Sequence, residues 1–131
     1  MGAKGLDEAN AVLNQYLRGT SPALPSAFYL ALLTADPGPL EDMSSEVANA
    51  EYARQPISYP VATTGSVANN GEVMFPVVVT SWGTILFAAI VDTLTGPPSI
   101  LMYYGPLSVP VTPMVGDVVQ LKVGQGVVTE S

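Results

Sequence analysis

Five of the eleven acidic residues fall in one segment, residues 36–51, and clustered carboxylates are the side chains of this sequence best suited to chemistry. Carboxylate oxygens suit Ca²⁺, but the spacing lacks the alternating Asp or Asn and the central Gly of a calcium loop. Glycosidases need two carboxyl groups at a defined separation in a cleft, and this spacing does not fix such a pair. We therefore interpret the segment as a solvated or partner-contacting loop and predict no metal site. Its acids are Asp36, Glu41, Asp42, Glu46 and Glu51.

The sequence contains no cysteine and no histidine. This excludes thiol nucleophiles, disulfides, His–Cys zinc sites, imidazole bases and every Ser-His-Asp triad. Gly124 and Gly126 follow an expected strand with no helix after them, so they indicate a turn rather than a phosphate-binding loop. We predict no catalytic residue, no cofactor and no enzymatic activity.

Charge is scarce and mostly negative. Charged residues make up 11% of the chain, against about 25% in an average soluble protein, and the net charge is −7. Nucleic-acid binding needs clustered Lys and Arg, whereas Lys4, Arg18, Arg54 and Lys122 are scattered, so we predict no nucleic-acid partner. The longest apolar run, residues 85–91, is far below the roughly 18 residues of a membrane span. We therefore predict no membrane partner.

Residues 6–18 show the spacing of an amphipathic helix. Leu6, Leu13, Tyr16 and Leu17 fall on its apolar stripe, and Gly19 provides a stop signal. A helix of this length is marginal in water on its own. The stripe is therefore expected to dock either on its own domain or on a neighbouring subunit.

From residue 26 onward, short β-type runs alternate with Pro, Gly and Asn clusters. We predict a single domain over residues 1–131: a helix at 6–18 and, over 26–131, a small antiparallel β-sandwich of Greek-key or jelly-roll type, interrupted by the acidic loop 36–51. The fold class is mainly β with one N-terminal helix. The expected strands are 27–34, 55–59, 66–68, 72–75, 84–92, 100–104, 118–123 and 126–129.

Two of these strands, 28–33 and 85–91, are apolar on both faces. A sheet with one face in water alternates polar and apolar residues, so both faces need a cover. The cover is either the sandwich core with the helix, or another subunit. Because so few ionic groups would leave a monomer with large apolar patches, we predict a homo-oligomer or a component of a larger assembly.

Besides the apolar stripe of the expected helix, three residues are candidates for an interface: Tyr52, Arg54 and Trp82. Trp82 is either a core or edge aromatic or a binding hot spot. Arg54 pairs either with an internal carboxylate or carbonyl or with another subunit. The candidate interface residues are Leu6, Leu13, Tyr16, Leu17, Tyr52, Arg54 and Trp82.

Several short sequence motifs resemble those of a family of small bacteriophage virion proteins, whose members are labelled tail fibre, head decoration or structural proteins. They are FYLALLTADP at 28–37, EYARQPI at 51–57, the stretch 75–92 with SWGTI, LMYYGPL at 101–107 and VGD at 115–117. The resemblance runs in order over most of the chain. It implies a non-enzymatic β-rich building block located in the virion and assembled in the host cytoplasm.

Within that family, the sequence favours a capsid decoration or cement protein, which would bind the major capsid protein lattice and copies of itself. The chain shows no fibrous repeat, no heptads beyond its first helix and no collagen-like segment of the kind that fibre shafts use. The alternative is a tail or tail-fibre component involved in host attachment.

Overall fold

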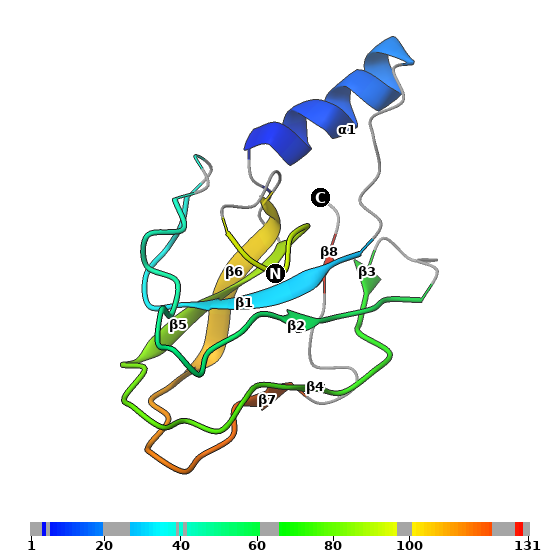
Figure 1. The fold of residues 1–131 in the computed structure, drawn as a ribbon. Helices are drawn as coiled ribbons and strands as arrows, with labels where there is room; N and C mark the ends of the chain where they lie inside the picture. Colours follow the sequence, from blue (N-terminus) through cyan, green and yellow to red (C-terminus); the bar gives the residue numbers. More distant parts are fainter. Residues whose placement is uncertain are drawn as a thin grey trace.

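The protein is mainly β, with antiparallel sheets and little helix (Figure 1). The structure, a computed structural model, describes residues 4, 6–19, 27–38, 40, 42–60, 66–96, 101–121 and 128–129. Its elements are α1 (Leu6–Arg18), β1 (Tyr29–Leu33), β2 (Gln55–Pro56), β3 (Ser66–Val67), β4 (Val73–Met74), β5 (Ile85–Val91), β6 (Leu101–Val111), β7 (Gln120–Leu121) and β8 (Val128–Thr129).

Four strands form the central sheet in the order β2-β1-β5-β6, with antiparallel neighbours throughout. Two short antiparallel ladders join β3 to β8 and β4 to β7. Among the described strands, seven fall within segments that the sequence predicts to be strands, and β6 begins in one. Residues 61–65 and 97–100, two of the connections, lie outside the described residues.

Strand β6 is longer than the sequence predicts, because it continues from residue 104 to Val111 through Pro106 and Pro110. In the described pairings β6 is at the edge of the central sheet, where the missing N–H of proline is tolerated. The register also shifts: Phe87 pairs with Pro106 but Ile85 pairs with Val111. The extra residues of β6 therefore form an irregular bulge that absorbs the prolines.

Both faces of the central sheet are buried over most of β1 and β5. Alternate side chains of β1 and β5 point to opposite faces, so Leu30, Leu32 and Ile90 join one apolar cluster while Leu33 and Val91 join another. The first cluster also contains side chains from outside the central sheet, among them Val47, Ile57, Val73, Phe75, Val78 and Trp82. The two strands with apolar faces on both sides thus need no second subunit to cover them.

Helix α1 lies at one end of the molecule, beside β6 (Figure 1). It ends at Gly19, which has a φ of 70° and donates its N–H to the Gln15 carbonyl at 3.2 Å; a positive φ is the conformation in which glycine commonly ends a helix. The helix contacts β6. In the described ranges, no helix is both long and apolar enough to cross a bilayer.

Candidate functional site

The acidic segment covers an edge of the central sheet. Strand β2 pairs with β1 at Tyr29 and Leu30 only. Farther along β1, the Val47 N–H donates to the Leu32 carbonyl at 3.1 Å, and the Thr34 N–H donates to the Ser45 carbonyl at 3.0 Å. An exposed strand edge is a template for unwanted pairing with other chains. The segment around residues 45–47 removes that template by occupying it.

The described carboxylates of this segment are used for local structure. Asp36 accepts a hydrogen bond from the Gly38 N–H at 2.8 Å, and Asp42 accepts one from the Ser44 N–H at 3.0 Å. Such turns are the usual role of Asp in loops. The Ser44 N–H also lowers the pKa of Asp42. Glu41 lies outside the described residues, and within them no group of acids gathers as metal ligands.

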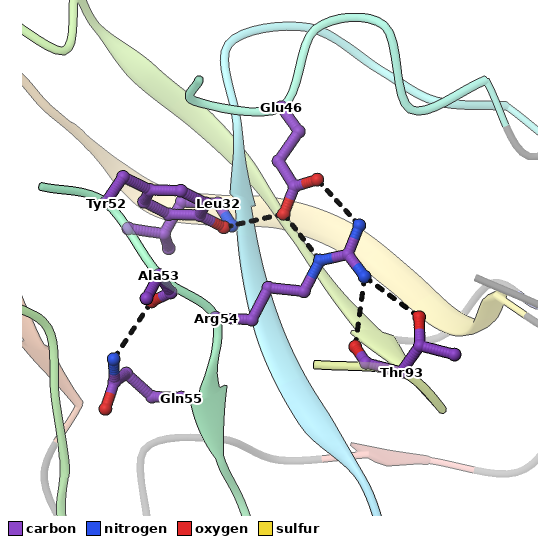
Figure 2. Close-up of polar contacts among 7 residues, drawn as sticks. All are labelled: Leu32, Glu46, Tyr52, Ala53, Arg54, Gln55 and Thr93. Carbon is purple, nitrogen blue, oxygen red and sulfur yellow. Dashed lines mark hydrogen bonds and ion pairs between the residues drawn. The ribbon is translucent and has the colours of Figure 1, made fainter. Parts of the chain in front are cut away.

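Arg54 forms a buried polar centre with Glu46 from the same segment (Figure 2). Its Nε donates to Glu46 Oε2 and its Nη2 to Oε1, both at 2.8 Å, a bidentate arrangement that is the strongest form of such a pair. Its Nη1 donates to the Thr93 carbonyl and hydroxyl at 3.0 Å. The Arg54 and Glu46 side chains are 6% and 15% exposed. Arg54 therefore pairs internally, and the bond to Glu46 raises its pKa.

Tyr52 connects this centre to β1 (Figure 2). Its hydroxyl donates to Glu46 Oε2 at 2.8 Å and accepts the Leu32 N–H at 3.0 Å. Burial raises its pKa. The Tyr52 ring is stacked on Phe75 and meets Trp82 edge-on, with centroids 5.9 and 5.5 Å apart. The polar centre is thereby continuous with the apolar core.

A second carboxylate, Glu51, holds the loop before β5. Its Oε1 accepts the backbone N–H groups of Thr80 and Val79 at 2.9 and 3.0 Å and the Trp82 indole N–H at 3.0 Å. The backbone hydrogen bond from Thr80 is the largest reason why the pKa of Glu51 falls from 4.5 to about 2. Sequence reasoning counted Glu51 among the loop acids but did not find this role, because its donors lie about thirty residues away.

These contacts define what the centre can do chemically. A shallow hollow of about 300 Å³ borders Glu46, Asn49, Tyr52 and Arg54. The acid and the base beside it are already bound to each other, and the Tyr52 hydroxyl both donates and accepts. A general acid or base needs a proton that it can exchange with a substrate. The arrangement instead fits a clamp that joins the acidic segment to β1 and to Thr93.

The structure divides the predicted interface residues into two groups. Tyr52, Arg54 and Trp82 pack against or bond to residues of their own chain, and Trp82 is a buried core aromatic. The leucines of α1 are different: Leu6, Leu13 and Leu17 are 47%, 55% and 77% exposed. Tyr16 lies on the same helix, but its side chain is outside the described part.

Sequence reasoning missed a second exposed apolar surface, which we call the apolar end. Backbone hydrogen bonds join its two main segments: Val78 N–H to the Asp117 carbonyl, Gly116 N–H to the Val78 carbonyl and Phe75 N–H to the Val119 carbonyl, at 2.8–2.9 Å. A signal was present, because residues 73–116 contain a single charged residue, Asp92. The exposed side chains of the apolar end are Met74, Val77, Val79, Val109, Val111, Met114, Val115 and Val118.

Comparison with known families matches residues 7–129 to Podophage GP4 fiber I protein gp80. The chain belongs to this family. It is accordingly a bacteriophage virion structural protein, as its resemblance to small virion proteins indicated. A search of curated proteins found no match.

In this member of the gp80 family, the two exposed apolar surfaces lie at opposite ends of the molecule (Figure 1). Helix α1 projects at one end, and the β4–β7 ladder with the loop that follows β6 lies at the other. A virion protein acts through the surfaces by which it joins its neighbours, so these two ends are the candidate functional sites.

Proposed function

We propose that this protein is a non-enzymatic building block of the phage fibre that joins another virion protein through its apolar end. The observation that carries the proposal is the apolar end itself: eight exposed Val and Met side chains between residues 74 and 118, a stretch whose charged residues are Asp92 and Asp117 alone. Large apolar patches rimmed by polar residues are typical of protein interaction sites. The description of the matched family, a fibre protein, supports the place in the particle.

The fold supports a structural role for the same surface. We propose that the β4–β7 ladder packs on the central sheet as the second layer of a small sandwich. Val73 of β4 is buried in the same cluster as Leu30 and Ile90 of the central sheet, and Leu121 of β7 packs against it. A rigid two-layer body loses little conformational freedom when it binds, which favours affinity.

A second candidate is a capsid decoration protein bound to the major capsid protein lattice. The compact form supports this alternative, because the described strands belong to one body without the repeats of a shaft. Both candidates include association with further copies of the chain. They differ in number, since a shell coat requires hundreds of copies per particle and a fibre far fewer.

The test combines location with surface variants. Virions would be produced with Met114→Asp/Val115→Asp at the apolar end, or with Leu94→Asp as a control on an exposed leucine that is not part of the apolar end. The double variant should fold but enter particles at least about tenfold less, which corresponds to about 1.4 kcal/mol of binding, while L94D enters normally. Equal incorporation of both variants would refute the role of the apolar end.

Counting and imaging distinguish the two placements. Quantitative mass spectrometry of purified virions gives the copy number, and cryo-electron microscopy of the same sample locates the protein. A low copy number with density on a fibre supports the fibre proposal. Hundreds of copies arranged on the head would refute it and support decoration.

A further inference from the structure

The exposed leucines of α1 form one narrow stripe. A helix advances about 100° per residue, so Leu6, Leu13 and Leu17 fall within an arc of about 40°. All three are about half exposed or more. A stripe of leucines along a helix is the usual form of a helix–helix contact.

This stripe is not the side by which α1 meets its own body. Ala9 and Val12 are half-buried and lie about 60° and 120° around the helix from Leu6. Helix α1 contacts β6, and Lys4 just before the helix places its Nζ 5.8 Å from the ring centre of Tyr103 in β6. The helix therefore uses one side against the sheet and leaves the leucine stripe beside it uncovered.

The charges of α1 indicate which partner is complementary to the leucine stripe. Asp7 lies in the first turn, and Arg18 lies in the last. Positions 7 and 18 lie about 100° and 120° from Leu6, on the same side of the stripe. If a second α1 packs along the stripe in the opposite direction, the acidic first turn of each helix lies beside the basic last turn of the other. The surface is thus complementary to itself.

We propose that α1 of one copy packs antiparallel against α1 of a second copy, about a two-fold axis near Leu13. Such an isologous contact uses the same patch on both subunits, and the opposed helix dipoles favour it further. A parallel pair would instead place both acidic first turns at the same end, away from the basic last turns. The inference specifies the self-association named in the proposed function, and it holds for a fibre or a shell.

The first test measures mass in solution by light scattering after size-exclusion chromatography. The full chain should show twice its monomer mass of 13.6 kDa, and Leu13→Gln should return it to the monomer. The matched control is Leu40→Gln, which changes an exposed leucine outside the helix and should leave the dimer intact. A monomeric wild type, or an L13Q variant that stays dimeric, would overturn the proposal.

The second test uses the charges. Arg18→Glu alone and Asp7→Lys alone should each weaken the dimer, because each sets like charges against each other. An equimolar mixture of the two variants should recover a dimer, since position 7 of each copy then faces an opposite charge at position 18 of the other. Circular dichroism checks that the helix is retained. A mixture that stays as weak as its components would overturn the proposal.

The third test fixes the direction of packing. The natural chain has no cysteine, so introduced cysteines report on one contact. A mixture of Leu6→Cys and Leu17→Cys copies should form mixed disulfides on mild oxidation. Preferential Leu6→Cys homodimers would show parallel packing and overturn the antiparallel arrangement. Because these tests use the purified chain, their failure leaves the particle experiments on the apolar end unaffected.

Discussion

At the scale of single residues, Arg54 owes its burial to a complete set of partners. A buried guanidinium is costly unless it is paired and hydrogen-bonded, and here Glu46 and Thr93 accept all the bonds described. The pair also joins three distant parts of the chain: the acidic segment, the start of β2 and the end of β5. Its removal should therefore affect stability rather than any chemical activity.

Arg54→Ala should destabilise the protein by about 3–5 kcal/mol, because it leaves the Glu46 carboxylate buried without its counter-charge. Arg54→Lys keeps the charge but loses the bidentate geometry, so its loss should be smaller. Chemical denaturation followed by circular dichroism measures both. An unchanged midpoint for R54A would contradict the role given to this pair.

The hydrogen bonds of Glu51 lead to a prediction about the stability of the protein at low pH. Its pKa is about 2 in the folded protein against an ordinary value of 4.5. A carboxyl group with a lowered folded pKa contributes stability that is complete above 4.5 and is lost as the pH falls towards 2. Glu51→Gln should remove that part of the pH dependence, so its stability profile between pH 4.5 and pH 2 should be flatter than that of the wild type.

Trp82 provides the measurement, because it is the single tryptophan and its indole N–H binds Glu51. Its fluorescence in denaturant titrations at several pH values would follow the loop that Glu51 holds. Glu72→Gln is the control, since Glu72 is an exposed carboxyl group outside this loop. Parallel pH profiles for wild type and E51Q would refute the assignment.

At the scale of elements, Gly83 sets the entry into β5. Its φ is +76°, and a Cβ there would lie 3.8 Å from Thr34 Cγ2, an ordinary contact. The obstacle to a side chain is therefore the left-handed backbone, not space. Gly83→Ala should cost about 1–2 kcal/mol.

Gly71 is the matched control for Gly83. A Cβ at this position would meet only Ser58 Oγ, at 3.9 Å, and its φ lies outside the left-handed region. Thermal unfolding of G83A and G71A under the same conditions measures the difference. Equal melting temperatures for the two variants would show that the turn before β5 tolerates a side chain.

The elements also show how far sequence reasoning reaches. The strands were predictable because Pro, Gly and Asn mark their ends and apolar runs mark their centres, as at 29–33 and 85–91. The extension of β6 beyond residue 104 was not predictable, because proline usually marks the end of a strand and the sequence does not show that a bulge at the sheet edge accommodates it. For Arg54, the sequence predicted the kind of internal partner, a carboxylate or a carbonyl, but not that it is Glu46 and Thr93. The apolar end was missed because residues around 78 and 116 become neighbours only in the folded chain.

At the scale of the whole molecule, the apolar end carries few of the charged residues. The chain has a net charge of −7, and the two carboxylates described at this end, Asp117 and Glu51, accept the N–H groups of Met114 and Val79. Contacts made there should depend little on Coulomb attraction. They should resist salt, because salt screens charges but does not weaken apolar burial.

We therefore expect the protein to stay on purified virions when NaCl is raised from about 0.1 M to about 1 M, where the screening length falls from about 10 Å to 3 Å. Sedimentation of washed particles followed by quantitative gel electrophoresis measures the amount retained. Release of most of the protein at high salt would show that charged groups, and not the apolar end, hold it in place.

The two short ladders also govern the order of events during synthesis. Ser66 pairs with Thr129 and Val73 with Leu121, so each ladder can close only after its later strand has been synthesised. The helix at residues 6–18 has local hydrogen bonds and is synthesised before either ladder. In a heavily translated message, nascent copies would then expose the leucines of residues 6–18 before their sheets are complete. Neighbouring polysomes are thus where such helices would first meet.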